Sequence, residues 1–166
     1  VYDTYSGYSY HPYWSGENFY IYEFRLENGD TTYRRRERID YIVGSGHQTR
    51  SYLLEREGRF FEAPITWYVT RARWDLSPGY EDGQNTRFDR TIGAECMACH
   101  TGHFDYVEGT VNMYGEVSLG IDCEKCHGPG SIHIERKEEG ELIDVGKYTD
   151  YSIVNPAKLS IKQRFD

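Results

Sequence analysis

The chain has 166 residues, enough for one domain or for one domain with an extension. Hydrophobic residues make up only 38% of it, and aromatic side chains, 16 tyrosines among them, supply much of that fraction. The net charge of −8 argues against a nucleic-acid partner, because binding to phosphates requires a basic face. No apolar run approaches the ~20 residues that cross a bilayer, so we expect no membrane span.

Residues 1–17 mix tyrosine, serine and glycine and show neither helical nor strand periodicity. So many aromatic rings indicate a covered segment, since exposed aromatic patches usually mark contacts. We therefore predict an aromatic N-terminal arm, packed either along its own domain or on a neighbouring subunit. His11 lies in this arm.

Residues 18–88 are predicted to form antiparallel β-hairpins in a sheet of three or four strands. In the first part, aromatic and apolar side chains alternate with charged ones, which is typical of a strand. Asn28-Gly29 is a strong hairpin signal, and a return strand is expected from Thr31 to Val43. A second hairpin is expected from Ser51 to Val69, with its turn at Glu57-Gly58.

All four cysteines lie in two Cys-x-x-Cys-His motifs. The motif residues are Cys96, Cys99 and His100 in the first, and Cys123, Cys126 and His127 in the second. This pattern attaches a c-type haem: two thiols form thioethers with the vinyl groups and the adjacent histidine binds the iron. The sequence therefore predicts two covalently attached haem c groups.

Two alternatives explain the cysteine pairs less well. A four-cysteine zinc ribbon also contains two such pairs, but it does not explain a histidine after each of them. A thioredoxin-like redox site requires an alternating strand and helix pattern that is not recognisable here. Because a porphyrin is a large apolar plate, we expect the haems to complete a sparse core and their removal to unfold the chain.

We expect short helices near residues 92–102 and 119–127, around the two motifs, and an irregular tail from residue 141. A further helix is expected over residues 131–139. The predicted fold class is α+β with much irregular structure: N-terminal antiparallel β-hairpins followed by a haem-binding region of short helices and loops. The predicted division is an arm (1–17), a hairpin region (18–88) and a dihaem region (89–166), packed as one domain.

Several segments together resemble the bacterial multihaem c-type cytochromes, relatives of the tetrahaem electron carriers of nitrifying bacteria. The segments are 41–53, 74–80, 123–133 and 155–159, so the resemblance spans roughly residues 40 to 160. In such proteins the last histidine of Cys-His-Gly-Pro-Gly-x-x-His is often an axial ligand, which the resemblance implies for His133. Similar chains usually carry further haem motifs on both sides, so we expect either a reduced two-haem form or a fragment.

The resemblance also implies a location. Haem attachment to this motif takes place outside the cytoplasm in prokaryotes, so we expect an extracellular or periplasmic protein whose export signal has been removed before Val1.

Chain length constrains the second ligand of each iron. His133 follows His127 by six residues, at most about 20 Å of extended chain, which is too short to circle the macrocycle of its own haem. We therefore predict that His133 binds the iron of the Cys96/Cys99 haem. His47 follows two glycines that let the backbone approach a flat ligand, and it is predicted to bind the other iron.

Other side chains are further candidates for binding iron or haem. His103 and His11 are the further histidine candidates, and Met113 is the one thioether candidate. Four arginines, at positions 34, 35, 36 and 38, are expected on a solvated strand surface, or in part paired with haem propionates.

The predicted function is electron transfer by a dihaem c-type cytochrome, with redox partner proteins or extracellular acceptors as its partners. The alternatives are a haem enzyme of the nitrogen-oxide reductase or peroxidase type with one open iron position, and a fragment of a larger multihaem oxidoreductase. No catalytic residue is identified. The histidine of the aromatic arm also suggests assembly with copies of itself into an extracellular filament, for which the alternative is a monomeric shuttle.

Overall fold

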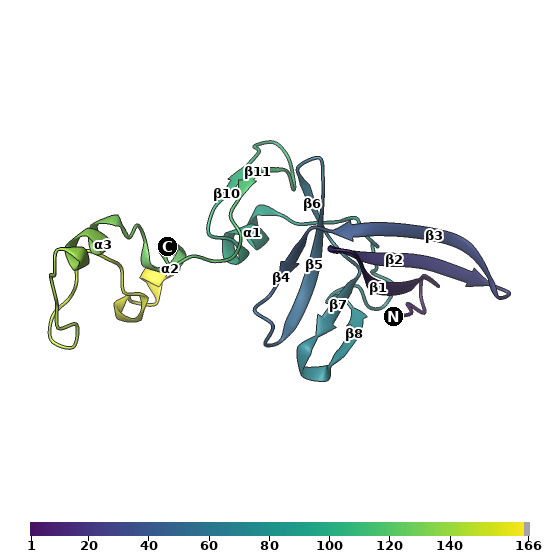
Figure 1. Cartoon of the computed structure of the whole chain (residues 1–166), viewed down its shortest axis with the longest axis horizontal. Coiled ribbons are helices and arrows are strands. Elements are labelled where there is room, and N and C mark those ends of the chain that lie inside the picture. The colour runs from purple at the N-terminus through teal and green to yellow at the C-terminus, as the bar shows by residue number, and fades with distance from the viewer. Residues whose placement is uncertain (165–166) are drawn as a thin grey trace. The chain divides into compact units, whose positions relative to one another are not determined.

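The structure is a computed structural model and describes residues 1–164. It divides into two compact units (Figure 1). Unit 1 comprises residues 1–97 and 105–115, and unit 2 comprises residues 98–104 and the chain from 116 onward. No helix among the described residues has the length and apolar character needed to cross a membrane.

The first sheet of unit 1 is a three-stranded antiparallel meander. Its strands are β1 (Ser9–Ser15), β2 (Asn18–Glu27) and β3 (Asp30–Ile39), in that order across the sheet. Asn28 and Gly29 both have positive φ, 52° and 89°, as a two-residue hairpin turn requires. The first predicted hairpin is therefore confirmed, although its return strand ends at Ile39.

The second sheet of unit 1 has six strands and surrounds the long strand β5. The strands are β4 (Tyr41–Val43), β5 (Thr49–Arg56), β6 (Arg59–Glu62), β7 (Ile65–Tyr68), β8 (Arg73–Leu76) and β9 (Arg90–Thr91). Their order is β8-β7-β5-β6-β9, with β4 also paired to β5, and a 3-10 turn, η1 (Val69–Arg71), joins β7 to β8. The predicted turn at Glu57-Gly58 is confirmed between β5 and β6.

Strand β1 corrects the prediction that residues 1–17 contain no strand. It pairs with β2 along its whole length, with Tyr10 opposite Glu23, and Tyr10 is only 2% exposed. The arm therefore packs along its own domain. The strand period is hidden in the sequence because aromatic residues occupy both faces of β1, so polar and apolar positions do not alternate.

The core of unit 1 is built from side chains of both sheets and of the loop that precedes β9. Its buried members are Tyr10, Ile21, Ile39, Tyr52, Leu54, Ala63, Ile65 and Phe88. This cluster of side chains is a core of unit 1 by itself.

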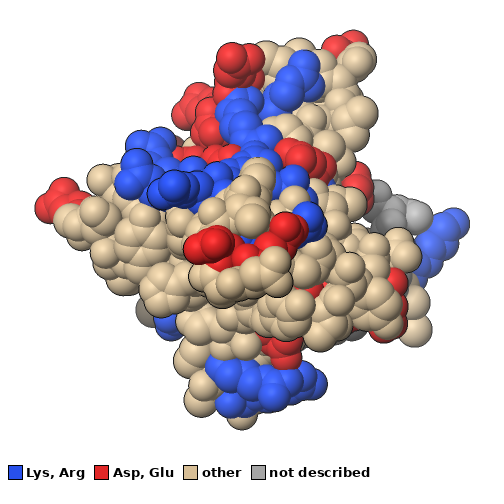
Figure 2. All heavy atoms as spheres, turned by 90° about the vertical axis from the view of Figure 1, so that its right-hand side faces the viewer, with Lys and Arg blue, Asp and Glu red and all other residues tan. Residues whose placement is uncertain are grey.

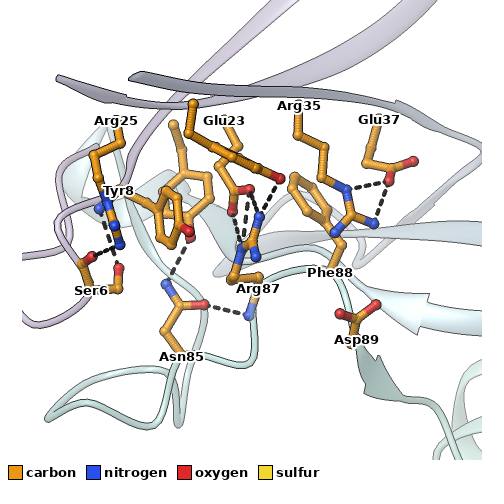
Figure 3. Close-up of polar contacts among 12 residues, drawn as sticks. Ser6, Tyr8, Glu23, Arg25, Arg35, Glu37, Asn85, Arg87, Phe88 and Asp89 are labelled. Carbon is orange, nitrogen blue, oxygen red and sulfur yellow. Dashed lines mark hydrogen bonds and ion pairs between the residues drawn. The ribbon is translucent and has the colours of Figure 1, made fainter. Parts of the chain in front are cut away.

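A polar network attaches the loop before β9 to the inner face of the first sheet (Figure 3). Arg87 donates two hydrogen bonds from Nε to the carboxylate of Glu23, at 3.0 and 3.1 Å, and its Nη2 donates to Glu23 and to the Tyr33 hydroxyl. Glu23 is fully buried, so this guanidinium compensates a carboxylate that has left water. Asn85 adds a bond to the Tyr10 hydroxyl at 3.0 Å.

The remaining elements are short. They are α1 (Ala94–His100), β10 (Phe104–Tyr106), β11 (Tyr114–Val117), α2 (Glu124–His127), α3 (Ser131–Glu138), η2 (Pro156–Lys158) and η3 (Lys162–Arg164). Strands β10 and β11 form a two-stranded sheet. The helices lie where they were expected, but α1, α2 and α3 have only 7, 4 and 8 residues.

The fold class is a correction to the sequence prediction. Over residues 1–164 the structure has three sheets and eleven strands and is only 17% helical, so it is β-rich. The α+β prediction with a helical haem-binding region is wrong, whereas the N-terminal hairpins fit. The physical reason is that glycines with positive φ, such as Gly128 and Gly140, end the helices after one or two turns.

Candidate haem site

The first Cys-x-x-Cys-His motif lies on α1. Cys99 and His100 follow Cys96 by three and four residues, so all three side chains lie on neighbouring positions of one helix face. Cys96 is half-buried, and Cys99 and His100 are exposed. Both thiols and the imidazole therefore lie on the same side of the helix, as attachment of one haem requires.

The N-terminal end of α1 is held in unit 1. Met97 is 3% exposed and Ile92 8% exposed, and the Tyr114 hydroxyl donates a hydrogen bond to the Ile92 carbonyl at 2.7 Å. Burial, followed by the nearby charges of Glu95 and Cys96, raises the pKa of Tyr114 to about 12. The phenol thus stays protonated and remains a donor at neutral pH, which fixes the start of the motif.

The second motif begins at Cys123 and continues on α2. Both Cys123 and Cys126 are free and exposed. Gly128 ends the helix with a φ of +68°, and the Gly130 amide donates a hydrogen bond to the Glu124 carboxylate at 2.7 Å. The Gly-Pro-Gly segment after the motif is thereby folded back on α2, in unit 2.

The imidazole of His127 is oriented by the C-terminal tail. Its Nδ1 lies 2.8 Å from the Val154 carbonyl oxygen, and the Val154 amide donates to the His127 carbonyl at 3.0 Å. A carbonyl can only accept, so Nδ1 carries the proton of this bond. With its proton on Nδ1, the ring has Nε2 as the nitrogen that can bind an iron.

His133 on α3 is oriented in a similar way. Its Nδ1 lies 2.9 Å from the Ser152 hydroxyl, which itself donates to Asp150 at 2.5 Å and therefore accepts from the histidine. The Ser152 hydroxyl and amide hold the pKa of Asp150 well below its usual range, and Lys137, 3.1 Å away, adds to this effect. A charged carboxylate behind the ring makes a histidine a better metal ligand.

Both histidines border one pocket of unit 2, with a volume of about 610 Å³. Its apolar lining includes Pro129, Val145 and Ile153. Apolar walls beside histidine side chains are the surroundings that a haem requires. The residues present therefore fit the group that the cysteine motifs imply.

The structure places the remaining histidine candidates elsewhere. His47 is exposed on the loop between β4 and β5, in unit 1. Gly44 of this loop has a φ of +118°, and a side chain there would collide with the Thr49 carbonyl. The backbone turn alone therefore requires a glycine at this position, whether or not a flat ligand approaches the loop.

His11 and His103 are also exposed. The ring of His11 stacks on Tyr13 with centroids 6.0 Å apart, and the His103 amide donates to the Ser118 hydroxyl at 2.7 Å. The side chain of Met113 lies beside Gly58, at the turn between β5 and β6. Of the predicted ligands, the structure brings His127 and His133 to one pocket.

Sequence reasoning missed the residues that orient these two rings. Asp150, Ser152 and Val154 belong to the tail that was expected to be irregular. Their contacts with His133 and His127 join residues 19 and 27 positions apart, so no local spacing reveals them. Residues 1–164 contain no group of three or more His, Cys, Asp or Glu side chains that could hold a metal ion by itself.

Comparison with known families gives one match. Residues 75–128 match the family described as "Cytochrome c554 and c-prime". The matched segment is about a third of the chain and contains both Cys-x-x-Cys-His motifs. The comparisons with curated proteins and with solved structures gave no significant match. The family match supports a c-type cytochrome, an electron carrier with covalently bound haem c of a kind typically found outside the cytoplasm.

Proposed function

We propose that this protein is a dihaem c-type cytochrome that carries electrons between redox partners in the periplasm or outside the cell. One haem is attached at Cys96 and Cys99, and the other at Cys123 and Cys126. The family match supports this proposal because it spans both motifs. The haems supply one-electron redox chemistry, and the chain binds them, orients their ligands and limits access to the iron.

In this proposal His100 and His127 each bind the iron of the haem attached beside them. His133 binds the iron of the Cys96/Cys99 haem, since the chain from His127 is too short to reach around its own haem. His47 binds the iron of the other haem from its exposed loop. His103 and His11 are the alternatives if either assignment fails.

The observation that carries the proposal is the orientation of His127 and His133. Each ring has its Nδ1 held by the tail, and both histidines border one apolar-lined pocket. With His100 and His47 as the second ligands, each iron has two histidines and no open position, so it transfers electrons without binding a substrate. An enzyme of the nitrogen-oxide reductase or peroxidase type requires an open position with acid and base residues beside it.

The visible spectrum of the ferric protein tests this choice. We expect two low-spin haems and no rapid binding of carbon monoxide after reduction. A high-spin band in the unmodified protein would favour an enzyme. His133→Ala should leave both haems attached and convert one to high spin, whereas His103→Ala, the matched control, should leave the spectrum unchanged. If the two variants behave the other way round, His103 is the ligand.

Assembly into an extracellular filament stays a prediction. Because β1 is an integral strand, deletion of the arm would disrupt unit 1, so His11→Ala is the sharper variant. Filaments in electron micrographs of the holoprotein that disappear in His11→Ala would support assembly through this residue. If the particles have the size of a monomer even at high protein concentration, the protein is a monomeric shuttle.

A further inference from the structure

The first sheet of unit 1 has two chemically different faces. Its inner face carries Ile21 and Glu23, both fully buried, together with Arg35, which forms an ion pair with Glu37 at 2.5 Å. Figure 3 shows these charged side chains pointing from the strands toward the loop that contains Arg87. Because side chains alternate along a strand, the residues between them form the opposite, outer face.

The outer face carries a group of five aromatic rings. They are His11, Tyr13, Tyr20, Tyr22 and Phe24. Three neighbouring pairs are stacked, with centroids 5.4 to 6.0 Å apart and interplanar angles of 16° to 24°. At one side of the rings, His11, Tyr22 and Phe24 border a hollow of about 540 Å³.

Three exposed arginines complete the outer face. Arg34, Arg36 and Arg38 on β3 lie directly opposite Phe24, Tyr22 and Tyr20 on β2. The guanidinium of Arg36 lies over the Tyr20 ring, 4.9 Å from its centroid.

These arginines have few carboxylate partners. Arg38 forms an ion pair with Asp40 at 2.6 Å, whereas over residues 1–164 no ion pair involves Arg34 or Arg36. Although the chain has a net charge of −8, the positive charges of Arg34 and Arg36 are therefore not neutralised by a carboxylate in an ion pair. Figure 2, seen from the right-hand side of Figure 1, shows Lys and Arg gathered in clusters, with Asp and Glu beside several of them.

We propose that this outer face is a docking surface for a protein partner that presents a patch of carboxylates. Tyrosine and arginine are enriched in the centres of protein interfaces, and alternate arginines on a strand offer charges spaced by about 7 Å. Carboxylates of a partner would bind the free guanidinium groups, and the edges of the rings would supply apolar contact.

The ring geometry favours a protein over a single-stranded nucleic acid. A nucleic acid binds to such surfaces by stacking its bases on open aromatic faces. Here stacked neighbours and the Arg36 guanidinium already cover much of those faces.

The size of the outer face indicates a transient contact. Seven paired residues of β1 and β2 span about 20 Å, and the outer strands lie about 10 Å apart. This area is well below the roughly 800 Å² per partner of a standard stable interface and is in the range of weak electron-transfer encounters. We therefore expect fast binding that weakens steeply as the salt concentration rises.

Binding of the holoprotein to poly-L-glutamate, measured at low and at moderate salt, tests the proposal. The triple variant Arg34→Gln/Arg36→Gln/Arg38→Gln should weaken binding at least tenfold. The matched control, Arg50→Gln/Arg59→Gln/Arg71→Gln, removes three exposed arginines of unit 1 outside this face and should change binding less than twofold. Hydroxyl-radical footprinting should show Tyr13 and Tyr22 protected by poly-L-glutamate.

Three outcomes would overturn the proposal. Equal weakening in both triple variants would mean that only total charge matters. Tighter binding to an oligothymidylate or to phosphatidylglycerol vesicles, lost in the first variant alone, would assign the face to a nucleic acid or to a lipid surface. Protection of the same tyrosines by increasing protein concentration, without poly-L-glutamate, would assign it to a second copy of this chain. None of these readouts depends on the number of haems, so the test is independent of the proposed function.

Discussion

Unit 1 and unit 2 are stabilised in different ways. Over the described residues, every buried apolar side chain lies in unit 1. Unit 2 instead exposes large apolar side chains: Leu119 is 83% exposed, Leu142 91% and Tyr151 90%. Ordering a chain costs about 1–2 kcal/mol per residue in backbone entropy, and burial of apolar surface is the main term that offsets it. Unit 2 therefore requires apolar surface that its own side chains do not provide.

The difference teaches which part of the protein depends on haem. Unit 1 has a core of its own and a buried ion pair, so it should fold without a prosthetic group. Unit 2 contains the second motif, both oriented histidines and the apolar-lined pocket, so its order should depend on covalent haem. We therefore expect removal of haem to unfold unit 2 and to leave unit 1 folded. The following variants test this contrast, from the largest expected effect to the smallest.

The double variant Cys123→Ser/Cys126→Ser should lower the haem count by one and abolish amide hydrogen-exchange protection across α2 and α3. The fluorescence of the tryptophans, all of which lie in unit 1, should keep its native unfolding midpoint in urea. Loss of the unit 1 transition in this variant would show that the two units do not fold independently.

Arg87→Ala should destabilise unit 1 by about 3–5 kcal/mol, because it leaves the fully buried Glu23 carboxylate without its charged partner. Urea unfolding followed by tryptophan fluorescence measures the effect. The control Arg71→Ala removes an exposed arginine that lies over the Tyr68 ring, and it should cost less than about 1 kcal/mol. A similar loss of unfolding free energy in the two variants would show that the Arg87 network does not stabilise unit 1.

A matched pair of leucines compares the two units directly. Leu54→Ala deletes a side chain that is 1% exposed and should destabilise unit 1 by about 2–5 kcal/mol. Leu142→Ala deletes one that is 91% exposed and should change the urea midpoint of unit 1 by less than about 0.5 kcal/mol. A large effect of Leu142→Ala on haem retention or on spin state would instead show that this side chain packs against the haem.

Ser152→Ala should have the smallest effect, and it should act on the haem site alone. It removes the hydroxyl that accepts from His133 Nδ1, and loss of such a partner typically lowers metal affinity by about 10–100-fold. The measurement is the fraction of high-spin haem as pH or temperature is raised, with urea unfolding of unit 1 as the control. Ser160→Ala, in the same tail, should leave the spin state unchanged.

The sequence predicted the features that depend on local chemistry. The turns at Asn28-Gly29 and Glu57-Gly58 were found because positive φ favours these residue types. The haem cysteines and their adjacent histidines could be predicted because each motif is contiguous. The short helices were also placed correctly, since glycine marks their ends.

The features that depend on tertiary contact were missed. Strand β1 was missed because aromatic residues occupy both of its faces, and the fold class was wrong because β4 to β9 are short strands with little alternation. The orientation of His127 and His133 depends on Val154 and Ser152, which approach only in the folded chain. A linear pattern contains no signal for such contacts.

The intact mass of the denatured holoprotein tests the central claim most directly, because thioether-linked haem remains attached when the chain unfolds. The account predicts the mass of the chain plus two haems. A mass of the chain alone, with a metal ion that is lost on denaturation, would contradict covalent haem and favour a metal bound by the cysteines. A mass with one haem would contradict the assignment of both motifs.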